Sequence, residues 1–228
     1  MVFKKYVHTR LILLPVATYA KRQCEPVIAV KADGTRIEGF TKSRLINYLK
    51  PNVSSVSIST EPDGKETKFT SDEVVELIFP PTEEDTTVTV YHAVMAQKHM
   101  PHKWNKNPKT YDKPIFLRLI YNGDYVKGYA RPAMDNTYTP SMTMVNYTWL
   151  YYYKLADQET TKAYWLDSKD IIPGMRKVMK FYFREFPGLQ KMVDKKELTP
   201  HEFRANPSVV LPLMDAEAKL RSEGGAGK

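Results

Sequence analysis

The sequence predicts an α+β protein, with an N-terminal module like a small β-barrel and a C-terminal antiparallel sheet packed by one amphipathic helix and short helical turns. Residues 25–79 alternate between apolar and polar side chains, and residues 115–166 repeat this pattern with many aromatic rings. Residues 171–186 then change to a helical period. A chain of 228 residues, 42% apolar and 26% charged, fits one globular domain or two small ones.

The β module is expected to span residues 23–81. Apolar residues at 27–30 precede an Asp33-Gly34 turn, in which Gly34 supplies the positive φ of a hairpin. Further strands are expected at residues 35–40, 53–58 and 67–79. Several short strands in so few residues indicate a strongly bent sheet or barrel.

A boundary is expected near residue 81, because Pro80 and Pro81 cannot donate to a sheet ladder. Residues 82–113 are then a linker, with one strand at 88–94 followed by a basic loop. The chain is too weakly apolar for a membrane helix, since its longest apolar run covers only residues 11–17.

Residues 114–206 form the predicted antiparallel sheet and its helices. An Asn122-Gly123 turn joins strands at 116–121 and 125–129, and a polar stretch at 133–146 separates this hairpin from later strands at 148–155 and 163–166.

The amphipathic helix at 171–186 is expected to begin after an N-cap at Ser168 or Asp170, with Pro173 in its first turn. Short helical turns are expected at 189–193 and 200–205. Residues 207–228 are expected to be a flexible tail, because they end in a Gly-rich run.

The chain is basic, with 34 Lys and Arg against 26 Asp and Glu, which gives a net charge of +8. This charge favours polyanionic partners such as nucleic acid, anionic lipid or acidic glycans. Residues 1–22 are interpreted either as an export leader or as a first strand. Lys4, Lys5 and Arg10 precede the apolar run, and small residues at Thr18 and Ala20 suit a signal peptidase.

No catalytic motif is present in the sequence. It contains no Gly-x-Ser-x-Gly elbow, no phosphate-binding glycine loop and no dinucleotide fingerprint, so we predict a protein that is not an enzyme and has no cofactor. The single cysteine, Cys24, excludes an intramolecular disulfide. His99 and His102 have metal-ligand spacing, but Pro101 argues against a helix there, and no metal site is predicted.

The basic loop is the strongest candidate binding surface. Lysines could grip phosphates while an aromatic ring stacks on a base or sugar, and the alternative is an ordinary solvated loop. The candidate residues are Lys98, Lys103, Trp104, Lys106, Lys109 and Tyr111.

Two weaker candidates have structural explanations. An aromatic cluster could face carbohydrate, but alternation along a strand places about half of its rings in the core. Asp167 and Asp170 could pair as acid and base, but helix capping is the simpler explanation for them. The aromatic cluster comprises Tyr147, Trp149, Tyr151, Tyr152, Tyr153, Tyr164 and Trp165.

Several segments resemble uncharacterised exported proteins of Bacteroidetes bacteria. The resemblance rests on an Asp-Gly-Thr strand pair at 32–40, a Gly-x-Val-x-x-Tyr-like hairpin at 124–129 and a Tyr-rich strand ending in Lys154. It continues through the helix entry at 166–169, the Phe-Pro-x-Leu turn at 186–189 and the Glu-Leu-Thr helix start at 197–199. It implies an envelope or periplasmic location and carries over no catalytic residue.

The expected function is therefore a non-enzymatic binding or scaffolding role at the bacterial cell envelope. Its partner would be an envelope protein or an acidic glycan or lipid surface. The alternative is a cytosolic nucleic-acid-binding protein that uses the basic loop.

Overall fold

The computed structural model describes residues 24–43, 45–46, 50–83, 86–98, 108–138, 143–166, 174–205 and 207–225. The predicted leader or first strand at residues 1–22 lies outside these ranges.

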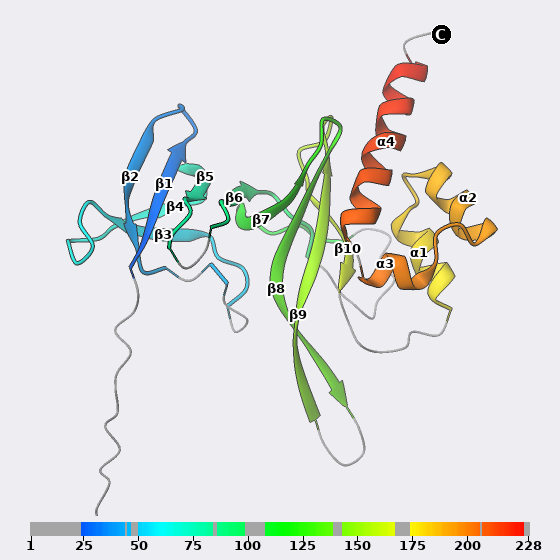
Figure 1. The fold of residues 1–228 in the computed structure, drawn as a ribbon, viewed down its shortest axis with the longest axis horizontal. Coiled ribbons are helices and arrows are strands. Elements are labelled where there is room, and N and C mark those ends of the chain that lie inside the picture. Colours follow the sequence, from blue (N-terminus) through cyan, green and yellow to red (C-terminus); the bar gives the residue numbers. More distant parts are fainter. Residues whose placement is uncertain are drawn as a thin grey trace, which may run out of the picture.

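Ten strands form one open sheet in the order β10-β9-β8-β7-β6-β5-β1-β2-β3-β4 (Figure 1). Every neighbouring pair is antiparallel. The strands are β1 (Glu25–Lys31), β2 (Arg36–Thr41), β3 (Ser55–Ser59), β4 (Thr67–Thr70), β5 (Val74–Phe79), β6 (Thr89–Val94), β7 (Ile115–Asn122), β8 (Val126–Tyr138), β9 (Thr143–Leu155) and β10 (Lys162–Leu166).

This sheet confirms the α+β class and the predicted hairpins, including the turn at Gly34, whose φ is +84°. The two halves are continuous, because β6 pairs with β5 on one side and with β7 on the other. Within the described strands no pairing closes β1 to β5 on themselves, and a closed barrel is not confirmed.

The longest strands, β8 and β9, differ most from expectation. They pair without interruption from Val126 opposite Leu155 to Tyr138 opposite Thr143, so the polar stretch expected to separate strands lies mostly inside them. Their far ends extend beyond the rest of the sheet as a two-stranded ribbon (Figure 1). A β-branched residue such as Val145 suits this extended backbone.

Four helices lie at the C-terminal end of the sheet (Figure 1). The predicted amphipathic helix is confirmed as a shorter element whose N-cap is Gly174, with φ 74°. The predicted N-cap residues Ser168 and Asp170 lie outside the described residues. At α3, the side-chain carboxylate of Glu202 accepts a hydrogen bond from the Thr199 backbone N–H at 2.7 Å, as in a capping box. The helices are α1 (Met175–Tyr182), α2 (Pro187–Lys195), α3 (Pro200–Ala205) and α4 (Pro207–Gly225).

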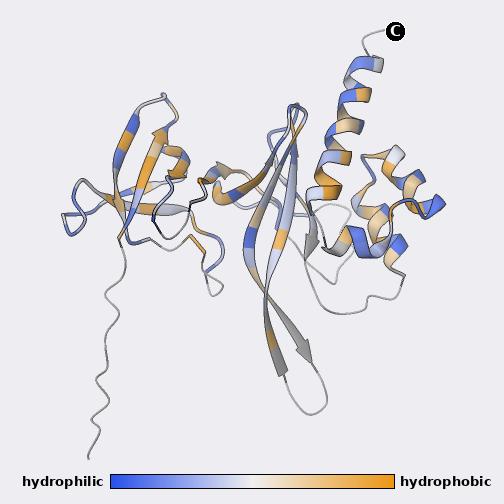
Figure 2. Ribbon diagram, viewed as in Figure 1, coloured by the Kyte–Doolittle hydropathy of each residue, from blue (hydrophilic) through white to orange (hydrophobic). Residues whose placement is uncertain are grey.

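The flexible tail predicted for residues 207–228 is wrong for residues 207–225, because these form α4. The prediction rested on the glycines at the C-terminus and did not take account of the apolar residues at helical spacing that precede them. Four of these side chains are buried: Val210, Leu211, Met214 and Ala218. Figure 2 shows apolar and polar residues alternating along α4, as expected for a helix with one side against the protein.

Helix α4 contacts the β7–β8 hairpin through Leu211 and Asp215, among other residues. A Cβ atom at Gly128 would lie 2.3 Å from Leu211 Cδ1, so the helix approaches the strand where no side chain intervenes. One carboxylate oxygen of Asp215 accepts hydrogen bonds from the backbone N–H groups of Tyr125 at 2.9 Å and Val126 at 2.6 Å. The last long helix and the central hairpin therefore fix each other's position.

Both faces of β9 are buried against different cores. Tyr153 packs with the helices, and Tyr152 packs on the opposite face with side chains from β6 to β8. A third core fills the N-terminal half around Val27, Leu77 and Tyr91.

We expect Asp215→Ala to lower the free energy of unfolding by about 1–3 kcal/mol, because it leaves two backbone N–H groups without an acceptor. Asp215→Asn keeps one oxygen and should cost less. Asp157→Ala, at an exposed position in a turn, is the control and should change stability by less than about 0.5 kcal/mol. Urea unfolding of the three variants measures this, and equal stability of Asp215→Ala and Asp157→Ala would contradict it.

Candidate functional site

The predicted basic surface is described at three of its six residues. Lys98, Lys109 and Tyr111 are placed, whereas Lys103, Trp104 and Lys106 lie outside the described residues. His99 and His102 lie outside them as well.

A short antiparallel bridge brings the three placed residues together. The Lys98 backbone N–H donates to the Lys109 carbonyl at 2.6 Å, and the Tyr111 N–H donates to the Ala96 carbonyl at 2.9 Å. Lys98 Nζ lies 5.6 Å from the centroid of the Tyr111 ring, in a cation–π contact. Its ion pair with Asp112 is long, at 3.9 Å, and contributes little because that carboxylate is 96% exposed.

Beneath this bridge lies a buried arginine that sequence reasoning missed. Arg131 on β8 is only 9% exposed. Its Nε donates to the Tyr152 hydroxyl at 2.9 Å, its Nη1 donates to the Pro132 carbonyl at 3.1 Å and its Nη2 donates to the Tyr111 hydroxyl at 3.4 Å. We call Lys98, Tyr111, Arg131 and Tyr152 the Arg131 cluster.

All three acceptors of Arg131 are neutral. No carboxylate forms an ion pair with it in the described part of the chain. A buried charge without a counter-charge is costly, and it leaves a positive potential that an incoming anion would lower. Burial raises the pKa of Tyr152 to about 12 although Arg131 opposes the shift, so this phenol stays protonated and can keep accepting from Arg131 through its lone pairs.

The alternation of residues along the strand could have indicated that Arg131 is buried. This residue shares one strand face with Tyr129 and Ala133, both buried, so it is a charged residue at an inward position of an alternating strand. An arginine is rarely buried at such a position unless its charge is paired.

Three of the six rings of the aromatic cluster that the structure describes are buried, in line with the expectation that about half lie in the core. Tyr152, Tyr153 and Tyr164 are each at most 3% exposed, and Tyr147 at 64% is the outward ring. The Trp165 side chain and residues Asp167 and Asp170 lie outside what the structure describes.

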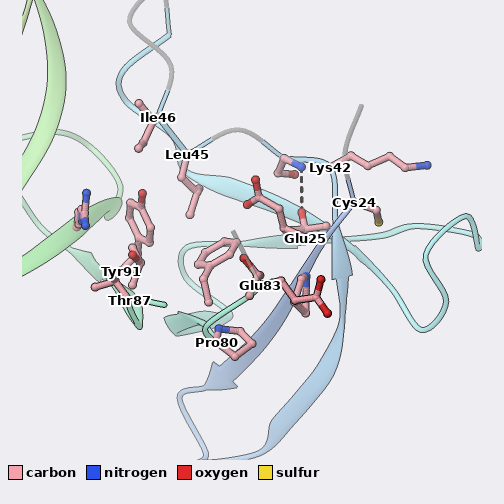
Figure 3. A pocket seen from close by; sticks show the side chains of 16 residues that line it. Cys24, Glu25, Lys42, Leu45, Ile46, Pro80, Glu83, Thr87 and Tyr91 are labelled. Atoms are coloured by element: carbon pink, nitrogen blue, oxygen red, sulfur yellow. Dashed lines mark hydrogen bonds between the residues drawn. The ribbon is translucent and has the colours of Figure 1, made fainter. Parts of the chain in front are cut away.

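The structure also contains a pocket of about 780 Å³ that sequence reasoning did not anticipate (Figure 3). It lies beside the start of β1, the segment that follows β2, and strands β6 and β7. Its apolar lining comes from Leu45, Ile46, Phe79 and Pro80.

Tyr91 and Arg118 line this pocket from neighbouring strands. They are directly opposite in the β6–β7 register, so their side chains leave the same face of the sheet. Tyr91 is 6% exposed and contacts Phe79 edge-on at 5.7 Å between ring centroids. Burial raises the pKa of Tyr91 to about 12, Arg118 lowers it and Glu25 raises it further.

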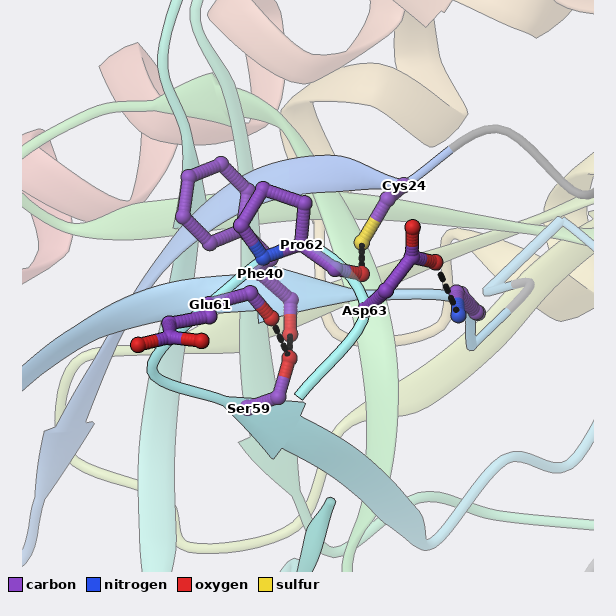
Figure 4. A network of polar contacts seen from close by, with 7 residues as sticks. Cys24, Phe40, Ser59, Glu61, Pro62 and Asp63 are labelled. Carbon is purple, nitrogen blue, oxygen red and sulfur yellow. Dashed lines mark hydrogen bonds and ion pairs between the residues drawn. The ribbon is translucent and has the colours of Figure 1, made fainter. Parts of the chain in front are cut away.

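Polar contacts fix the turn that follows β3 against the rim of the pocket (Figure 4). The Cys24 thiol donates to the Pro62 carbonyl at 2.9 Å, and Lys42 Nζ donates to Asp63 Oδ1 at 3.0 Å. The Ser59 hydroxyl contacts the carbonyls of Phe40 and Glu61. Cys24 and Lys42 on the pocket rim are therefore already engaged.

Among the described residues no group of three or more His, Cys, Asp or Glu side chains could hold a metal ion. None of the described helices is long and apolar enough to cross a membrane. Comparisons with protein-family models, with curated proteins and with solved structures find no match.

We expect Tyr152→Phe to lower the free energy of unfolding by about 1–3 kcal/mol, because it leaves the buried Nε of Arg131 without an acceptor. Tyr164→Phe is the matched control, since the Tyr164 hydroxyl is buried without a hydrogen-bond partner and its removal should be neutral or stabilising.

Adding Arg131→Met to Tyr152→Phe should recover part of the lost stability, because the unpaired charge is removed as well. Urea unfolding of the four proteins tests this. Equal effects of Tyr152→Phe and Tyr164→Phe would contradict a specific role for the Arg131–Tyr152 hydrogen bond.

Proposed function

We propose that this protein is a non-enzymatic binding or scaffolding protein of the bacterial cell envelope, and that it holds an anionic group of its partner at the Arg131 cluster. The observation that carries the proposal is the buried charge of Arg131, whose described partners are all neutral. The partner would be an envelope protein or an acidic glycan or lipid surface.

The surroundings of Arg131 favour an anion over a neutral partner. The backbone hydrogen bond from Lys98 to Lys109 places these two lysines side by side near Arg131, and Lys109 is exposed. An anion at this surface would interact with the exposed lysine ammonium groups and with the buried Arg131 guanidinium. The attraction to Arg131 would be stronger, because the effective dielectric constant is lower around a buried charge. The net charge of +8 supports attraction of an anion at longer range.

The envelope setting is supported by the leader-like residues 1–22 and by the resemblance to exported proteins. It is tested by the mass of the protein from fractionated cells of its native host. We expect a chain that lacks about the first 20 residues, recovered with membranes or periplasm. A full-length chain in the cytosol would contradict the envelope setting and favour the alternative.

The alternative is binding of nucleic acid at the same surface. It is favoured by the Tyr111 ring beside Lys98, because a lysine next to an aromatic ring is a common arrangement for contacting a phosphate and stacking on a base. Trp104 belongs to the same predicted surface.

We expect Lys98→Gln/Lys109→Gln to elute from a heparin column at lower salt than the unsubstituted protein, because two cationic contacts are lost. The control is Lys177→Gln/Lys191→Gln, which removes the same charge from exposed positions on α1 and α2. If both pairs shift elution equally, only net charge matters and the Arg131 cluster is not the binding surface.

The same three-protein comparison separates the two partner classes when anionic phosphatidylglycerol vesicles and single-stranded DNA replace heparin at equal salt. Preference for vesicles supports the envelope role. Preference for DNA, with a steep loss of binding as salt rises, supports the alternative.

A further inference from the structure

We propose that the pocket beside β1, β6 and β7 is a second binding site, and that it takes a short peptide or a similar small zwitterion with an apolar body. The ligand's carboxylate would meet Arg118 and Tyr91. Its ammonium group would meet Glu25 and Glu83 at the rim. This site is separate from the Arg131 cluster, so the inference goes beyond the proposed function.

The first argument is the unused hydrogen-bonding capacity of the two inner groups. In the described structure neither the Arg118 guanidinium nor the Tyr91 hydroxyl has a hydrogen bond or an ion pair with another residue. Arg118 is partly buried and Tyr91 is almost fully buried. A guanidinium is planar and presents donors that match both oxygens of a carboxylate, and an adjacent phenol can add a third donor.

The second argument is the order of charges from the inside of the pocket to its rim. Glu25 and Glu83 line the rim, are exposed and have no ion pair among the described residues. Lys42, the other charged lining residue, is paired with Asp63. Figure 3 shows Tyr91 on one side of the pocket and the two glutamates on the other. The pocket therefore has an unpaired positive charge, Arg118, on the side of Tyr91, and unpaired negative charges, Glu25 and Glu83, on the other side.

The charges of Arg118 and Glu25 both act on the Tyr91 hydroxyl. The Arg118 charge lowers the pKa of Tyr91 and the Glu25 charge raises it, so Tyr91 lies within the field of each. A ligand that spans from Arg118 to Glu25 would therefore need to be small. A simple anion would be repelled by the glutamates, and a simple cation would be repelled by Arg118.

The third argument is size and polarity. A volume of about 780 Å³ lies within the range of roughly 300–1,000 Å³ that holds drug-sized ligands. Leu45, Phe79 and Pro80 give the middle of the pocket an apolar lining, and Ile46 is 44% exposed beside them. A peptide with apolar side chains would cover Ile46 and fill this middle, whereas a free polar amino acid would not.

The test uses the tripeptide leucyl-alanyl-phenylalanine and isothermal titration calorimetry on the full chain. We expect saturable binding, a loss of about tenfold in affinity for the C-terminal amide of the tripeptide, and a smaller loss for its N-acetyl form. This comparison needs no variant, so it does not depend on whether a substituted protein folds. No saturable binding up to millimolar peptide, or equal affinity for acid and amide, would overturn the proposal.

Variants assign the binding to the pocket. Arg118→Gln should weaken binding of the free tripeptide by about tenfold and Tyr91→Phe by a few-fold. Arg36→Gln, at an exposed position on β2 outside the pocket, should leave the affinity unchanged. Equal affinities of Arg118→Gln and Arg36→Gln would overturn the assignment.

The outcome is independent of the proposed function. Arg118→Gln and Arg36→Gln remove the same charge, so they should shift heparin elution equally, and neither touches the Arg131 cluster. A failure of peptide binding leaves the heparin result unaffected.

Discussion

The burial of β9 on both faces, between the helices and strands β6 to β8, is the constraint on which the C-terminal half depends. Tyr153 lies in the core beneath the helices and Tyr152, one residue away, lies in the core on the opposite face. The helices therefore cannot move along the sheet without disturbing Gly128, where α4 approaches closest. On the opposite face the same alternation turns Arg131 inward and sets its contact with Tyr152. The candidate anion site is thus a consequence of strand periodicity.

The two proposed sites share a common physical origin. Each has an arginine that extends from a central strand, next to a tyrosine from a neighbouring strand, and neither arginine has a carboxylate partner among the described residues. The backbone ladder fixes the spacing of both pairs: Tyr91 is directly opposite Arg118, and Tyr152 is diagonal to Arg131, whose opposite residue is Leu150. The difference lies in access: Arg131 is beneath a bridge of backbone, whereas Arg118 lines a pocket.

Local sequence patterns predicted most of the strands and the hairpins, because turn residues such as Gly34 and Gly123 act within a few positions. They did not predict α4, since the buried side of that helix is recognised only by its contacts with β7 to β9, and the glycines at its end suggested the opposite. For the site, Lys98, Lys109 and Tyr111 were expected from local charge. Arg131, Tyr91 and Arg118 were not, because their significance depends on strand register, which joins residues far apart in the chain.

The strand order also implies an order of folding. From β5 to β10 each strand lies beside its successor in the chain, so these pairings close shorter connections, the longest being residues 95–114 between β6 and β7. β1 instead lies between β2 and β5, and its pairing with β5 must bring together segments separated by residues 32–73. Closing that longer connection costs more chain entropy before any contact is gained. We therefore expect the meander from β5 onward to assemble before β1 pairs with it. Amide protection from the β1–β5 pairing should appear after protection within that meander during refolding, whereas the β1–β2 hairpin closes only residues 32–35 and can form early.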